Sequence, residues 1–226
     1  MRLFLAALLC TFSIPARATT RPVSDVLARM DEASPSFKGM TAKVKRLTHT
    51  AVLNDTSEET GTVSILKAGP KDMRMLIELT QPDPKSYSFQ DRKAQIYYPK
   101  MQQVEIYDLG KHGKLVDQFL LLGFGTSGKE LAKSYNVRVL GDENIDGKKA
   151  VKLELTPKSE EAREHIKKVE IWLAENGEYP LQQKIYQSSG DHYVFTYSDV
   201  KLNPGLTAES VALKLPKNVR KVTPQN

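Results

Sequence analysis

Apolar and polar side chains alternate with period two along most of this chain, and that alternation restricts the fold more than any other feature of the sequence. Residues 72–80 are the clearest example, because side chains two positions apart share one face of a strand. The apolar set there is Met73, Met75, Ile77 and Leu79. A strand with one apolar and one polar face is typical of an antiparallel sheet that buries only one side.

Turn signals separate about a dozen segments of this kind. Asp146-Gly147 and Asn176-Gly177, for example, are dipeptides that favour hairpin turns. Because helices do not recur between the strands, the sequence predicts a mainly β protein with about 10–12 antiparallel strands. Residues 211–215 are predicted to form the last strand.

Two short stretches near the start and in the second half of the chain do not follow this pattern. Residues 22–33 form an amphipathic segment that Thr20 or Ser24 would cap. Residues 158–168 are predicted to be a charged loop or a short helical turn. The apolar face of the first segment holds Val23, Val26, Leu27 and Met30.

The segment 114–135 is the one long stretch in the middle of the chain that does not alternate. Strong helix formers at 117–122 and 129–133 flank the glycine-containing stretch 123–128. This arrangement predicts two short helices joined by a glycine hinge. An apolar, hinged insert in an antiparallel sheet has to cover something, so we expect it to form a lid over an apolar concave face.

The glycines of this insert also match two phosphate-binding patterns. Gly123, Gly125 and Gly128 fit G-x-G-x-x-G, and residues 123–129 fit G-x-x-x-x-G-K. A dinucleotide-binding loop requires a preceding strand and a parallel crossover, neither of which is expected here. A P-loop requires Ser or Thr after the lysine, where this chain has Glu130. Neither motif therefore predicts nucleotide binding.

The first 18 residues have the pattern of a secretory signal peptide. Arg2 precedes a short apolar run at 3–9, and Ala16-Arg17-Ala18 is a cleavage site of the A-x-A type. We therefore expect residues 1–18 to be removed and residues 19–226 to form a single exported domain. Lipid attachment at Cys10 is the alternative, but the preceding residue is a leucine, which is large for a lipidation site.

Cleavage at that site would leave a mildly basic chain without cysteine. The net charge of the full sequence is +6, and the leader contains two arginines and no acidic residue, so the remainder carries +4. Charges of both signs are mixed along the strands, which argues against a nucleic-acid-binding surface. Disulfide bonds and thiol chemistry are not expected.

Residues that could carry catalytic or metal chemistry are scattered. His49, His112, His165 and His192 do not stand at metal-ligand spacing. The chain has no G-x-S-x-G pattern, and paired carboxylates fall in predicted turns. We therefore expect no enzyme activity, no metal and no cofactor. The alternative is an exported hydrolase, for which a cluster of reactive groups would have to form on folding.

An apolar cavity between the sheet and the lid is the remaining candidate site. Methionine is unbranched and adaptable, so Met73 and Met75 on one face suit a cavity that accepts acyl chains of varied shape. The alternative is that the same residues are ordinary core beneath the first helix. The residues expected to line the cavity are Val63, Ile65, Met73, Met75, Ile77, Leu79, Val104, Ile106, Phe119, Leu121, Leu122 and Phe124.

Short motifs also follow one another along nearly all of residues 19–226. They are Ser36-Phe37-Lys38-Gly39, Thr80-Gln81-Pro82, Ile96-Tyr97-Tyr98-Pro99, Leu121-Leu122-Gly123-Phe124, Ile171-Trp172-Leu173, Tyr179-Pro180-Leu181 and Leu215-Pro216. In this order they resemble the bacterial outer-membrane lipoprotein carrier family, LolA and LolB, and particularly its divergent lipoprotein-sorting members.

The resemblance implies an unclosed half-barrel of antiparallel strands whose concave side is covered by helices. It implies a carrier in the periplasm that binds the acyl chains of lipoproteins or phospholipids for transfer toward the outer membrane. Its partners would be an inner-membrane transporter and an outer-membrane acceptor, and a monomer is expected. Gly69 stands where the carriers have an arginine that latches the lid. The alternative function is a non-transporting sensor or regulatory domain of the same fold that acts through a protein partner.

Overall fold

The computed structural model describes residues 21–69, 72–110 and 122–224. Twelve strands within these ranges form one sheet, in the order β12-β6-β5-β4-β3-β2-β1-β11-β10-β9-β8-β7. Their bounds are β1 (Gly39–Thr50), β2 (Asp55–Gly69), β3 (Asp72–Gln81), β4 (Lys85–Gln90), β5 (Lys93–Tyr98), β6 (Gln103–Asp108), β7 (Tyr135–Ile145), β8 (Lys148–Pro157), β9 (Ile166–Ala174), β10 (Pro180–Gln187), β11 (His192–Leu202) and β12 (Arg220–Val222).

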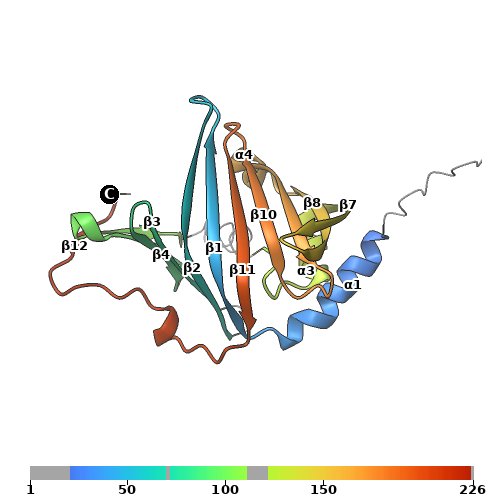
Figure 1. The fold of residues 1–226 in the computed structure, drawn as a ribbon, viewed down its shortest axis with the longest axis horizontal. Helices are drawn as coiled ribbons and strands as arrows, with labels where there is room; N and C mark the ends of the chain where they lie inside the picture. The colour runs from blue at the N-terminus through green and yellow to red at the C-terminus, as the bar shows by residue number, and fades with distance from the viewer. Residues whose placement is uncertain (1–20, 70–71, 111–121, 225–226) are drawn as a thin grey trace, which may run out of the picture.

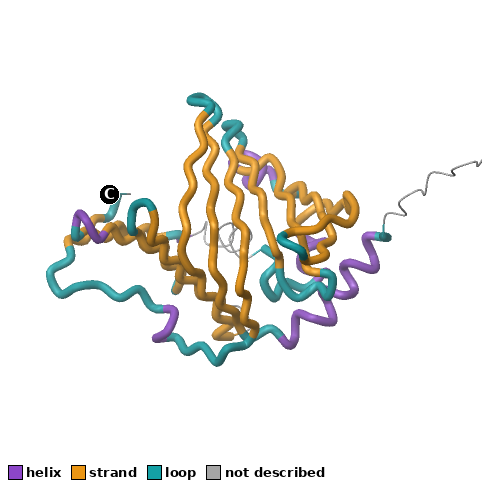
Figure 2. Tube along the Cα trace, viewed as in Figure 1, coloured by secondary structure: helices purple, strands orange, loops and turns teal. Residues whose placement is uncertain are grey.

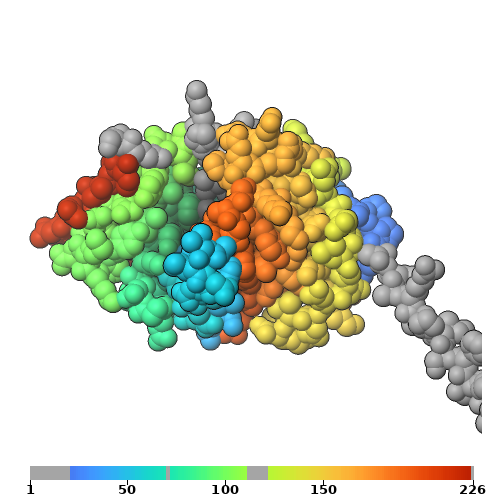
Figure 3. All heavy atoms as spheres, turned by 90° about the horizontal axis from the view of Figure 1, so that it is seen from above, coloured from blue at the N-terminus to red at the C-terminus, as the bar shows by residue number. Residues whose placement is uncertain are grey.

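The sheet does not close into a barrel, because β12 and β7 remain at its two edges. The long strands β1, β2 and β11 stand at its centre (Figure 1). Seen from above, the two halves of the sheet lie on either side of the β1–β2 hairpin (Figure 3). The predicted unclosed half-barrel is therefore confirmed, and β12, which pairs in parallel with β6, is the exception to its antiparallel order.

Short helical segments complete the described part of the chain (Figure 2). They are α1 (Val23–Ala33), η1 (Ser34–Ser36), η2 (Pro99–Met101), α3 (Gly128–Ser134), α4 (Glu160–His165) and η4 (Glu209–Val211). The helices predicted at 22–33 and 129–133 and the helical turn within 158–168 are thereby confirmed. Among the described residues, no helix is long and apolar enough to cross a membrane.

The caps of the two main helices differ from each other. Pro22 precedes α1 without a side-chain cap, and the Ser24 hydroxyl donates to Asp25 at 3.1 Å instead, so the prediction of a Ser24 cap is wrong. Thr20, the other predicted cap, lies outside the described residues. At α3, Ser127 and Glu130 form a reciprocal capping box that satisfies free backbone donors of the first turn.

The main core lies between the concave face of the sheet and the helices α1 and α3. Val26 and Met30 of α1 and Leu131 of α3 pack with inward-facing side chains of β1–β3 and β7–β11. The buried positions of α1 are those expected from its apolar face. Burying each such apolar side chain contributes about 1.5–3 kcal/mol, so this layer accounts for much of the stability of the fold.

The segment after β11 does not form the strand predicted at 211–215. It runs from the foot of β11 along the outside of the sheet to β12 (Figure 1). On the way, Leu206, Val211 and Leu213 cover Leu66 of β2 and Leu76 of β3 on the outer face. The apolar residues of this segment are therefore used for packing in a loop and the 3-10 helix η4, where an extended strand would present only alternate side chains.

The outer face of β8 and β9 carries a network of charged side chains. The Lys168 ammonium lies 2.9 Å from Glu154 and 2.7 Å from Glu170. Lys152 approaches the other oxygen of Glu170 at 3.5 Å. The main apolar core of these strands therefore lies on the concave side, and the outer face has only a small apolar cluster beside the charged network, made of Ala150, Trp172, Ala174 and Leu181.

Candidate functional site

A cavity of about 230 Å³ lies on the concave face, between the β3–β4 side of the sheet and the β9–β11 side. Figure 3 looks down on the ends of these strands, with the two halves of the sheet on either side of the β1–β2 hairpin. Most of the wall of the cavity is apolar or aromatic. The lining residues are Val44, Arg46, Ile77, Leu79, Tyr87, Phe89, Ile166, Ile185, Gln187, Tyr193 and Phe195.

The strand register explains why these residues share one face. Ile77 of β3 is paired with Tyr87 of β4, and Ile185 of β10 is paired with Tyr193 of β11. Directly opposed residues of antiparallel strands point to the same side of a sheet. The curvature of the sheet then brings the β3–β4 pair and the β10–β11 pair together across the cavity.

Polar side chains form a cluster at the wall of the cavity. Arg46 Nε donates to Glu59 at 2.7 Å, and its Nη2 donates to the same Glu59 oxygen. Its Nη1 donates to the Tyr87 hydroxyl at 3.3 Å. The Lys85 ammonium pairs with the second Glu59 oxygen at 2.5 Å. We call Arg46, Glu59, Lys85 and Tyr87 the Arg46 cluster.

Both cations of the Arg46 cluster remain charged at neutral pH. Burial by itself lowers the pKa of Arg46, but its interactions with Tyr87 and Glu59 outweigh that effect and raise the pKa above its usual value. Burial likewise lowers the pKa of Lys85, but the hydrogen bond to Glu59 and the charge interactions with Tyr87 and Glu59 together outweigh that effect, so that this pKa is also raised. The cluster therefore has two positive charges around one carboxylate.

The described part of the predicted lid begins at Leu122 and packs against the concave face. Leu122 and Phe124 are almost fully buried, and the Phe124 ring meets the Tyr197 ring edge-on at 5.2 Å. The Gln183 amide donates to the Leu122 carbonyl. These residues are fixed core contacts on the concave face, whereas 111–121, including Phe119 and Leu121, lie outside the described residues.

The glycines of the insert are required by close packing instead of by a hinge. Gly125 has a φ of +62°, and a Cβ there would lie 2.5 Å from the Phe37 ring. Gly128 begins α3 against α1, where a Cβ would lie 2.1 Å from the Leu27 carbonyl oxygen. In both places only glycine lets the chain pass close to α1 and η1.

Two of the residues predicted to line an acyl cavity do line the described one, namely Ile77 and Leu79. Val63, Ile65 and Met75 are buried in the core cluster that includes Val26 and Met30, and Met73 is half-buried against that cluster. For these four residues the alternative of ordinary core beneath the first helix is the better description. Their role in binding ligand stays a prediction without support from the cavity.

Val104 and Ile106 face away from the cavity, which corrects their assignment. Val104 pairs with Tyr97 and Ile106 with Gln95, and these partners pair in turn with Ser86 and Ser88 of β4. The cavity residues Tyr87 and Phe89 alternate with those serines and therefore point to the opposite face. A one-residue difference in register moves a side chain from one side of the sheet to the other.

The second wall of the cavity is not among the residues predicted from the sequence. Tyr193 and Phe195 stand two positions apart, which is the spacing of residues on one face of a strand. Nothing local indicated that this face would lie opposite Ile77. Arg46 was not predicted as a site residue, because a single arginine in a strand that also contains lysines does not by itself indicate a binding site.

Two of the titratable residues considered for chemistry, His49 and His192, come together in the described structure. Among the described residues, no three or more His, Cys, Asp or Glu side chains are placed to hold a metal ion. His49 and His192 stack with ring centres 4.7 Å apart. His192 has a pKa lowered mainly by burial. His112 lies outside the described residues.

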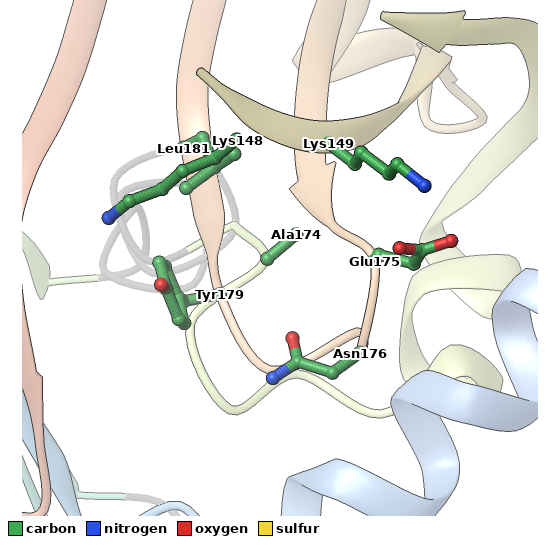
Figure 4. Close-up of a pocket in the computed structure, with 7 residues that line it drawn as sticks. All are labelled: Lys148, Lys149, Ala174, Glu175, Asn176, Tyr179 and Leu181. Atoms are coloured by element: carbon green, nitrogen blue, oxygen red, sulfur yellow. The ribbon is translucent and has the colours of Figure 1, made fainter. Parts of the chain in front are cut away.

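A second hollow of about 380 Å³ lies at the β9–β10 turn, beside the start of β8. Figure 4 shows its residues around an open depression, with the Lys148, Lys149, Glu175 and Asn176 side chains at its border. It is larger than the concave-face cavity but shallow and more polar. Its shape and lining resemble a water-filled surface depression more than a binding site for an apolar ligand.

Comparisons with known proteins identify a family model and a shared fold. A family model described as "-like: Uncharacterized protein" matches residues 71–207 of the chain. No curated protein matches it.

Solved structures that match with TM-scores above 0.5 share the fold of this chain at low sequence identity. The crystal structure of MucB is 18% identical, with a TM-score of 0.52 over 85% of this chain and 62% of that chain. An uncharacterized conserved protein from Thermus thermophilus is 14% identical, with a TM-score of 0.54 over 88% of this chain and 98% of that chain. The LolA superfamily protein NE2245 from Nitrosomonas europaea is 17% identical, with a TM-score of 0.40 over 84% of this chain and 97% of that chain. The chain thus spans less than two thirds of the MucB chain.

Proposed function

We propose that this chain, which belongs to the family whose model matches residues 71–207, is a divergent LolA/LolB-like protein that acts as a periplasmic carrier of acyl chains. The chains of lipoproteins or lipids would occupy the cavity on the concave face during transfer toward the outer membrane. No covalent bond would be made or broken, so the protein would not be an enzyme. An inner-membrane transporter and an outer-membrane acceptor are part of this proposal.

The observation that carries the proposal is the apolar cavity between Ile77 and Ile185 on the concave face. Cavities lined mainly by aliphatic and aromatic side chains with a few polar groups are typical of sites for apolar ligands. Burial of each methylene contributes about 0.8 kcal/mol, so about six methylenes would gain roughly 5 kcal/mol before the costs of association.

The volume of the cavity limits how much ligand it encloses. Sites that surround a whole drug-sized ligand measure about 300–1,000 Å³, whereas the described cavity measures about 230 Å³. The described space therefore suits part of one acyl chain. The rest of a ligand would extend along the concave face or toward solvent.

A charge placed on the cavity wall tests the proposal. Tyr193 lines the cavity, and its neighbour Val194 points to the outer face of the same strand. We expect Tyr193→Asp to abolish binding of a fluorescent fatty acid and Val194→Asp to retain it, because only the first change puts a carboxylate against the acyl chain. Circular dichroism would verify that both variants are folded.

Native mass spectrometry of the protein purified from a bacterial periplasm supplies the independent measurement. Added mass that corresponds to an acyl lipid, lost in Tyr193→Asp and kept in Val194→Asp, is the expected result. A protein that is purified without bound lipid and also does not bind added fatty acid would contradict the proposal.

The second candidate is a regulatory domain of the same fold that acts through a protein partner. Its support is the fold shared with MucB, a protein that has also been solved in complex with MucA. Affinity capture from periplasmic extract distinguishes the two functions. A stable protein partner together with absence of bound lipid would favour the regulatory domain over the carrier.

A further inference from the structure

The Arg46 cluster gives the apolar cavity a charged end. Among the described residues that line the cavity, Arg46 is the one with a charged side chain. That side chain is 16% exposed and the side chain of Glu59 is 8% exposed, so both groups are largely shielded from water. Charges in such surroundings interact more strongly than charges on an open surface.

The cluster also has more positive than negative charge. Glu59 accepts hydrogen bonds from Arg46 at one oxygen and pairs with Lys85 at the other. An ion pair built only for stability would need one of these cations. Keeping the second cation partly buried costs solvation, and an anion in the cavity would offset that cost.

Hydrogen-bond donors of the cluster remain available for such an anion. The guanidinium has five N–H groups, and its bonds to Glu59 and Tyr87 use three of them. The Tyr87 hydroxyl accepts from Arg46, which leaves its own hydrogen able to donate. A planar guanidinium binds carboxylate and phosphate groups especially well, because it presents two parallel donors.

We propose that the Arg46 cluster binds the anionic head, a carboxylate or phosphate, of the acyl ligand whose tail occupies the cavity. Arg46 and Tyr87 would touch the head, and Lys85 would act through Glu59 by balancing its charge. The preferred ligand is then a single-chain amphiphile with an acidic head. This inference rests on the proposed function and adds the class of ligand.

Three probes test the proposal on the unaltered protein by isothermal titration calorimetry. Dodecanoate has an apolar tail and an acidic head. Dodecanol has the same tail with a neutral head, and acetate has the acidic head without the tail. We expect dodecanoate to bind at least about tenfold more tightly than dodecanol, the size of one charged hydrogen bond. Acetate is expected to bind more weakly than dodecanoate by about tenfold or more, since it buries no chain.

Variants that each lose one positive charge test whether the preference for dodecanoate over dodecanol depends on the Arg46 cluster. Arg46→Gln should remove most of the difference between dodecanoate and dodecanol while both still bind. Lys45→Gln removes the same charge from the adjacent, exposed position of β1, which points to the other face, and should leave the difference unchanged. Lys85→Gln should reduce the difference without removing it.

The outcomes separate this inference from the function on which it rests. Equal affinity for dodecanoate and dodecanol would overturn the anionic-head site and leave the carrier proposal standing. If neither dodecanoate nor dodecanol binds, both the anionic-head site and the carrier proposal are overturned. If acetate binds as tightly as dodecanoate, the cluster is a site for a free anion, and the proposal of an amphiphilic ligand is overturned. If Arg46→Gln does not fold, the comparison of probes on the unaltered protein still decides the question.

Discussion

The Tyr197 hydroxyl donates to Gln183 Oε1 at 2.7 Å, and the amide of the same Gln183 donates to the backbone carbonyl of Leu122. This chain of hydrogen bonds joins β11, β10 and the segment before α3 inside the core. Burial raises the pKa of Tyr197, so the phenol stays protonated and serves as a donor. The contact fixes Leu122 against the concave face.

Loss of that contact should destabilise the protein. Tyr197→Phe leaves the buried Gln183 oxygen without its donor, and we expect a loss of about 1–3 kcal/mol in the free energy of unfolding. Urea denaturation followed by circular dichroism measures it. Gln182→Leu, at the neighbouring position on the outer face, should change stability by less than about 0.5 kcal/mol. A similar effect of both substitutions would show that the buried chain has no special role.

Gly128 should resist substitution even though its φ is ordinary. A Cβ at Gly128 would meet the Leu27 backbone, so Gly128→Ala has to push α3 away from α1. We expect a loss of about 1–3 kcal/mol, as for overpacked cores. Gly69→Ala is the control, because a Cβ there meets only Asp72 at 3.7 Å. If thermal denaturation shows equal stability for the two variants, the close approach of the helices is not essential.

Met75 should behave as a core residue and not as a ligand-binding residue. It is 2% exposed and does not line the cavity. Met75→Ala should therefore lower the free energy of unfolding by about 2–5 kcal/mol while fatty-acid affinity of the folded protein stays the same. Met73→Ala, at a half-buried position of the same face, should cost less. If Met75→Ala lowers the affinity for fatty acid and leaves the free energy of unfolding unchanged, Met75 is a ligand-binding residue.

The outer-face network should make stability depend on pH in the acid range. Burial raises the pKa of Glu170, but the hydrogen bond from Lys168 and the charges of Lys152 and Lys168 outweigh it, so the pKa is lowered. Because the folded carboxyl has the lower pKa, its contribution is present above the ordinary value of about 4.5 and is lost as pH falls through the folded value.

Glu170→Gln should remove that contribution, on the order of 1 kcal/mol. The variant would be less stable than the original protein at pH 7, and the difference would shrink as pH falls below about 4.5. Urea midpoints measured from pH 3 to pH 7 provide the check. Glu58→Gln, at an exposed position of β2, is the charge-matched control and should produce no such trend. A constant difference across this range for Glu170→Gln would contradict the assignment.

Local sequence determined the secondary structure of most of the described chain. The alternation of Met73, Met75, Ile77 and Leu79 placed one face of β3 inward, and the spacing of Val26 and Met30 placed one face of α1 inward. Both inferences succeed because the direction of a side chain in a strand or helix follows from backbone geometry within a few residues. The segment 211–215 is the exception, because contact with Leu66 and Leu76 on the outer face prevails over its local pattern.

Only the tertiary structure decided which inward-facing residues enclose the cavity. Ile77 and Ile185 meet because the sheet curves, while Val104 turns outward because of the register of β6 with β5. Arg46, Glu59 and Lys85 become a cluster only when three strands come together. Curvature, register and the balance of buried charge depend on contacts between residues distant in the sequence, and short-range patterns contain no information about those contacts.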